Sequence, residues 1–72
     1  MEEICRYHVE VLGPLDEGAF NATSPLALTV VRQDPGATLS SVCADQSGLI
    51  GLLRHLHRQG FLLLSVSRRS HT

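Results

Sequence analysis

The longest regular pattern in the chain lies between Asp45 and Ser67, where a helical periodicity passes directly into a short apolar run. Four leucines recur at spacings i, i+3, i+4 and i+7, which places them on one side of a helix. They are Leu49, Leu52, Leu53 and Leu56. Asp45 stands where an N-cap residue belongs, and Gly60 stands where a helix commonly ends in a left-handed turn. The pattern predicts a helix over about 46–59, followed by a strand over about 61–67.

Three earlier segments show the alternation that is typical of strands. They span about 4–12, 26–33 and 38–43. In the first, the odd positions from Cys5 to Val11 are apolar or aromatic and the even positions are polar, so one face should be buried. Asp34-Pro35-Gly36 predicts a tight turn, which makes a hairpin of the second and third strands. Turn formers surround Phe20 in the stretch from 15 to 25, a pattern that allows a short helical turn but does not support a full helix.

These elements predict a single α+β domain over residues 1–72, with one four-stranded, mostly antiparallel sheet and one long helix on one face. The order fits either a ferredoxin-like arrangement with a reduced first helix or a meander whose last strand lies beside the first. A chain this short buries only about 60% of its unfolded surface, so support from self-association is expected. The predicted homodimer face is the second side of the sheet, where we place Ile4, Val31 and Leu63.

The middle of the chain resembles a family of small uncharacterised bacterial proteins. The resemblance is most specific over residues 39–66, with an Ala-Asp-Gln start at 44–46, a Leu-Leu helix, Gly60, and a Leu-Leu-Ser-Val finish at 63–66. Residues 11–16, Val-Leu-Gly-Pro-Leu-Asp, resemble a corner of the chain that has the pattern Gly-x-Leu-Asp in that family. The chain departs from the pattern where Phe20 is the one aromatic after the corner, and where Ser41 replaces a usual glycine. The resemblance implies a bacterial, cytoplasmic protein without an established activity, and it assigns no catalytic residue.

The side chains that could carry chemistry do not form a recognisable site. His55 and His57 are two apart on the predicted helix and point in different directions, while His8 lies on the outer sheet face and His71 in the tail. Two cysteines, Cys5 and Cys43, lack further ligands for zinc and are expected to be buried free thiols. No serine sits in a nucleophile elbow. We therefore predict no enzyme activity, no metal and no cofactor, and no small-molecule ligand is indicated.

Charge is unevenly distributed, although the net charge is only −1. No acidic residue follows Asp45, whereas Arg54, Arg58, Arg68 and Arg69 all do, so these arginines are candidates for contact with nucleic acid or a protein partner. Arg54 and Arg58 are neighbours on one helical face and could hold two phosphates. Against this reading, the exposed sheet face offers no aromatic side chains for base stacking. Arginines near a helix C-terminus also complement its dipole without any ligand.

The sequence gives no sign of a membrane or secreted protein. No apolar run approaches the roughly 20 residues of a membrane span. The acidic start, Met-Glu-Glu-Ile, is unlike a secretory signal, and two unpaired cysteines fit a reducing cytoplasm. We interpret the protein as a non-enzymatic interaction or regulatory module that acts through self-association. The alternative is a nucleic-acid-binding accessory protein that uses the Arg54 and Arg58 face.

Overall fold

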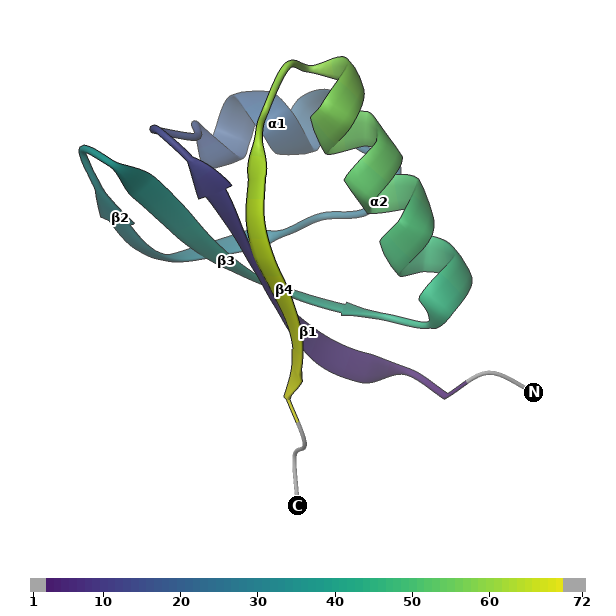
Figure 1. Cartoon of the computed structure of the whole chain (residues 1–72). Helices are drawn as coiled ribbons and strands as arrows, with labels where there is room; N and C mark the ends of the chain where they lie inside the picture. Colours follow the sequence, from purple (N-terminus) through teal and green to yellow (C-terminus); the bar gives the residue numbers. More distant parts are fainter. Residues whose placement is uncertain (1–2, 70–72) are drawn as a thin grey trace.

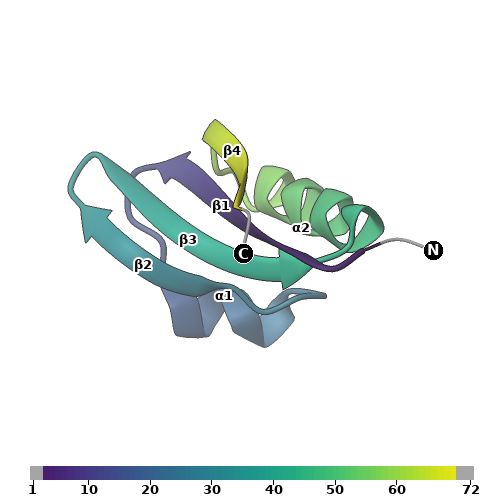
Figure 2. The same cartoon turned by 90° about the horizontal axis from the view of Figure 1, so that it is seen from below.

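The computed structural model of the chain describes residues 3–69, which form one four-stranded antiparallel sheet and two helices (Figure 1). The elements are β1 (Cys5–Leu12), α1 (Glu17–Thr23), β2 (Thr29–Asp34), β3 (Ala37–Ala44), α2 (Gln46–Arg58) and β4 (Leu63–Arg69). The strand order is β2-β3-β1-β4, so β1 and β3 are central and β2 and β4 are the edges (Figure 2). The predicted α+β sheet is confirmed, and the last strand does lie beside the first.

The alternating side chains of the central strand β1 divide cleanly between the two faces of the sheet. Its odd positions from Cys5 to Val11 are buried, and its even positions are half-buried or exposed. Val9 is fully buried and lies between Ser40 of β3 and Val66 of β4 in the two antiparallel registers. The predicted one-sided burial of this strand is therefore confirmed.

The predicted hairpin of β2 and β3 is also present. The Asp34 carboxylate accepts hydrogen bonds from the backbone N–H groups of Gly36 (3.0 Å) and Ala37 (2.9 Å), which fixes the turn. Strand β2 begins at Thr29, later than predicted, because the segment before it follows α1 instead of a neighbouring strand.

Helix α1 corrects two of the predictions, since the stretch from 15 to 25 contains a seven-residue helix and the sheet therefore carries two helices. Asp16 caps it by accepting from the N–H of Ala19 at 3.0 Å. Phe20 points into the core, where its ring makes edge-to-face contacts with His55 and Phe61. The helix forms because these long-range contacts bury Phe20, a gain that local propensity does not reveal.

The side chain of Asn21 ties α1 to the start of β2. Its amide donates to the carbonyl oxygen of Leu28 (2.9 Å) and accepts from the N–H of the same residue (3.0 Å). Leu28 itself is 2% exposed, so this pair of bonds satisfies backbone groups next to the core.

Helix α2 matches the prediction closely, from Gln46 to Arg58. The Asp45 carboxylate accepts from the N–H of Gly48 at 2.7 Å, as an N-cap should, and Gly60 has φ +90° just beyond the helix. Leu49, Leu52 and Leu56 are buried. Leu53, the fourth member of the predicted stripe, is only half-buried at the margin of the core.

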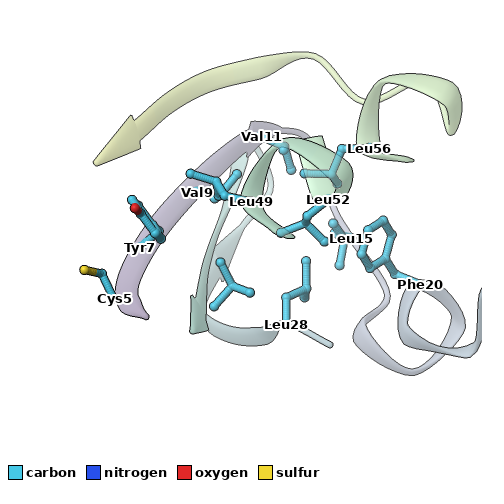
Figure 3. Close-up of a cluster of buried hydrophobic side chains, with 11 residues drawn as sticks. Cys5, Tyr7, Val9, Val11, Leu15, Phe20, Leu28, Leu49, Leu52 and Leu56 are labelled. Atoms are coloured by element: carbon cyan, nitrogen blue, oxygen red, sulfur yellow. The ribbon is translucent and has the colours of Figure 1, made fainter. Parts of the chain in front are cut away.

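The core lies between the two helices and the face of β1 and β3 (Figure 3). Its buried members include Val9, Val11, Leu52 and Leu56, but no residue of β4 belongs to it. Strand β3 places Thr38 and Ser40 in this layer, and both hydroxyls are satisfied. Thr38 donates to the carbonyl oxygen of Gly13 at 2.8 Å and Ser40 to that of Val9 at 3.0 Å.

Candidate interaction surface at the β4 edge

Strand β4 is an edge strand that is exposed along its whole length. All seven residues from Leu63 to Arg69 are exposed, including three large apolar side chains. The strand pairs with β1 on one side only, so its other side presents free backbone N–H and C=O groups (Figure 2). An unpaired, apolar edge of this kind is a template for pairing with another strand.

Apolar side chains gather at this edge. Eight large hydrophobic residues are exposed among the described residues, and five of them belong to β4, to the residue before it, or to the adjacent flank of α2. Together with Leu53 they form what we call the β4–α2 surface: Ile50, Leu53, Leu62, Leu63, Leu64 and Val66. An apolar concentration on one edge of a small domain indicates an interaction site more strongly than the same residues scattered singly.

The β4–α2 surface contains a shallow hollow of about 410 Å³. It exists because the buried leucines of α2 pack against β1, which leaves the helix side of β4 uncovered. Leu63 lies opposite Val11 of the core face and therefore points to the same side as α2. The residues that line the hollow are Ile50, Leu53, Arg54, His57, Arg58 and Leu63.

The opposite edge of the sheet, at β2, is protected. A carboxylate oxygen of Glu17 accepts a hydrogen bond from the backbone N–H of Val30 at 2.7 Å, and so occupies a group that an added strand would need. Both edge strands pair with a register shift, between Val30 and Arg32 in β2 and between Ser65 and Leu63 in β4, so this feature does not distinguish the two edges. The chain thus closes one edge of its sheet with a side chain and leaves the other open.

The three residues predicted as a dimer face do not lie together. Leu63 is on β4 beside α2, whereas Val31 is on β2 at the far edge, with β3 and β1 between them. Ile4 precedes β1 and is 65% exposed. Leu63 pairs with Val11 of the core face and so lies on the helix side of the sheet, not on its second face. Of the three, Leu63 belongs to the β4–α2 surface.

The four candidate arginines are separated into two pairs. Arg54 and Arg58 are exposed on α2 and border the hollow. Arg68 and Arg69 lie at the other end of β4, inside the strand, which extends beyond its predicted end at about residue 67. Arg68 is 3.4 Å from the carboxylate of Glu3. Only the first pair is therefore combined with the apolar hollow.

The histidines have separate surroundings. The ring of His55 packs edge-to-face on Phe20 at 5.1 Å, and its Nε2 is 3.3 Å from the hydroxyl of Thr23, so it joins α2 to α1. His57 faces the hollow, and His8 is half-buried on the outer sheet face. His71 lies outside the described residues. Over residues 3–69, no three His, Cys, Asp or Glu side chains are placed to hold a metal ion.

The cysteines also differ from expectation. Cys5 is buried as predicted, but Cys43 is exposed. Cys5 pairs with Ala44 and Arg6 pairs with Cys43, so the two thiols lie on neighbouring strands but on opposite faces of the sheet. Both are free.

The residues that sequence reasoning missed are Ile50, Leu62, Leu64 and Val66. Ile50 lies one position off the buried leucine stripe, and this offset was the available signal for an exposed apolar flank. The apolar run over 61–67 predicts a strand but does not indicate whether that strand is buried. Hydrophobicity alone does not distinguish a central strand from an edge strand, which depends on strand order.

The fold and this surface define a small α+β domain with one open, apolar sheet edge. The chain belongs to the family described as Domain of unknown function (DUF8691), whose model matches residues 6–67. Membership of an uncharacterised family, expected from the sequence, is thereby confirmed. No curated protein and no solved structure matches the chain. Within the described part of the chain, no helix is long and apolar enough to cross a membrane.

Proposed function

We propose that this protein is a non-enzymatic interaction module that forms a homodimer through antiparallel pairing of the β4 strands of two copies. The observation that carries the proposal is the contrast between the two sheet edges. The Glu17 carboxylate protects β2, whereas β4 offers seven exposed residues with free backbone groups on its outer side. Pairing would continue the sheet from four to eight strands and satisfy those groups.

The sequence of β4 suits pairing with itself in the antiparallel direction. A two-fold axis through Ser65 brings Leu64 of each copy opposite Val66 of the other, so apolar side chains meet near the axis. The same axis places Arg68 and Arg69 at opposite ends of the new ladder. Parallel pairing would instead bring the arginines side by side, which costs free energy. Charge therefore favours the two-fold arrangement.

Features of the wider architecture support the same proposal. We infer a ferredoxin-like arrangement with a reduced first helix, which the β-α-β-β-α-β order and the strand order β2-β3-β1-β4 support. In such an arrangement both helices cover one side and the backbone edge of β4 remains accessible. We place the protein in the bacterial cytoplasm, in a regulatory or scaffolding role, because its cysteines are unpaired and its relatives by resemblance are bacterial.

The test is the solution mass, measured by multi-angle light scattering over a wide range of protein concentrations at low and high salt. We expect a dimer whose mass does not fall at high salt, because apolar contacts and backbone hydrogen bonds hold it together. A Val66→Lys variant should be monomeric, since it places a charge opposite the leucine of the other copy.

A matched control is available on the opposite edge. Val31→Lys makes the same chemical change on β2, where the side chain is 54% exposed, and should leave the dimer intact. Circular dichroism establishes that both variants are folded. A wild-type monomer at all concentrations would refute the homodimer, and a dimer that survives Val66→Lys but not Val31→Lys would move the interface to β2.

A further inference from the structure

We propose that the hollow of the β4–α2 surface is a docking site for a short, acidic, amphipathic segment of another protein. The hollow combines an apolar floor with a basic border. Ile50, Leu53 and Leu63 supply the floor, and Ile50 remains 51% exposed and Leu63 38% exposed. Arg54, His57 and Arg58 form the border.

The charge of this region calls for an acidic partner. The chain has no acidic residue from Gln46 to its end, so α2 and β4 carry no carboxylate of their own. Among residues 3–69 the only ion pair joins Arg68 to Glu3, at the other end of β4. Among residues 3–69, Arg54 and Arg58 are thus exposed cations without a carboxylate within ion-pairing distance. Carboxylates on a partner would supply what this protein lacks at the site.

The apolar floor selects a peptide over other anionic partners. A nucleic acid could use the two arginines but would leave the floor uncovered, and it would need aromatic side chains for base stacking. The Tyr and Phe side chains, Tyr7, Phe20 and Phe61, all pack in or against the core. An anionic membrane would need apolar side chains that project outward as a broad face. Here Ile50, Leu53 and Leu63 instead line a shallow hollow with a basic border.

An amphipathic helix is the form of segment that best fits the recess. Its apolar stripe would enter beside α2, and its flanking glutamates would reach Arg54 and Arg58, as in other helix-in-groove complexes. The site is independent of the proposed homodimer. Pairing of β4 uses the backbone edge, whereas the hollow is formed by side chains on the helix side of the sheet.

The experiment measures fluorescence anisotropy of a labelled peptide with leucines at helical spacing and glutamates at the other positions. The full chain should bind it, and the same peptide with lysine in place of glutamate should not bind. Arg54→Gln/Arg58→Gln should weaken binding about tenfold at low salt, because two exposed charge contacts are lost. Ile50→Ser should weaken it about five- to tenfold through the loss of apolar contact.

Matched controls separate the local effect from the loss of charge or hydrophobicity in general. Arg32→Gln/Arg69→Gln removes the same charge elsewhere, and Ile4→Ser makes the same apolar change at another exposed position. Both should bind as the wild type does. Equal weakening by the control arginine pair would overturn the site, as would the absence of peptide binding.

Two further probes decide the class of partner. A single-stranded oligonucleotide and phosphatidylglycerol vesicles are titrated under the same conditions. Tighter binding of the oligonucleotide that Ile50→Ser does not change would overturn the proposal in favour of nucleic acid, and tighter vesicle binding would overturn it in favour of a membrane surface. Weak or absent binding of both supports the peptide site.

Discussion

Leu52 and Ile50 lie two positions apart in α2, yet the first is fully buried and the second is 51% exposed. Their difference shows how a helix divides neighbouring residues between core and surface, because successive side chains are rotated by about 100°. Leu52 belongs to the stripe that packs on β1, and Ile50 to the flank beside β4. An apolar side chain of similar size therefore stabilises the core at Leu52 and belongs to the candidate interaction surface at Ile50.

The first prediction at this scale is that Leu52→Ala destabilises the protein severely. Removal of a fully buried leucine costs about 2–5 kcal/mol, which is comparable to the total stability of a core this small. Urea titration followed by circular dichroism should show a protein that is largely unfolded without denaturant. Ile50→Ala, the control, should change the free energy of unfolding by less than about 0.5 kcal/mol. Equal effects would contradict the assigned buried face.

The second prediction concerns the cap of α2. Asp45→Ala should lower the free energy of unfolding by about 0.5–2 kcal/mol, because the N–H of Gly48 loses its acceptor. Asp45→Asn keeps an oxygen at the same position and should lose much less. Thermal unfolding of the three proteins tests this, and an alanine variant as stable as the wild type would show that the cap does not contribute.

At the scale of elements, the two helices have different structural roles. Helix α2 covers the centre of the sheet with three buried leucines. Helix α1 is short, and it holds its position through Phe20 and through the bonds of Asn21 with Leu28. Its first residue, Glu17, also reaches the edge of β2 and closes it. A helix of one or two turns thus both completes the core and protects one side of the sheet.

The third prediction follows from that contact. Glu17→Ala should free the N–H of Val30 and open β2 as a second pairing edge, so that species larger than a dimer appear as concentration rises. The lost hydrogen bond should also lower stability by about 1 kcal/mol. Glu17→Gln retains an acceptor oxygen and should behave like the wild type. Light scattering gives the answer, and an alanine variant with unchanged mass would show that another feature blocks this edge.

At the scale of the whole molecule, the two edges of the sheet differ, and the β4 edge is the one at which another strand could be added. Helices cover one side, a carboxylate closes β2, and β4 is left with apolar side chains and free backbone groups. The proposed pairing of two such edges would consume both and close the assembly at a dimer. The β4–α2 hollow lies beside this edge and remains on the helix side of the sheet.

The fourth prediction uses this asymmetry. Half of the β4 amides point away from β1, and in a homodimer they should exchange slowly with solvent deuterium at high protein concentration and quickly on dilution. Amides of the central strand β3 should be protected at both concentrations and serve as the internal control. Fast exchange throughout β4 at every concentration would count against pairing at this edge.

Much of the fold could be predicted from the sequence, because its signals are local. The leucine spacing, Asp45 and Gly60 define α2, and the alternation from Cys5 to Val11 defines the buried face of β1. The turn at Asp34 to Gly36 defines the hairpin. Each of these depends on residues within a few positions of one another, and local sterics, capping and periodicity determine them.

Only the tertiary structure decided α1, the strand order and therefore the candidate site. Phe20 is buried by residues that lie more than thirty positions further along the chain, so its helix is a consequence of folding. The run from Leu62 to Val66 is apolar in any arrangement, but it is exposed because β4 is placed at an edge. Sequence determined which segments are apolar; the packing of distant segments determined which of them remain open to a partner.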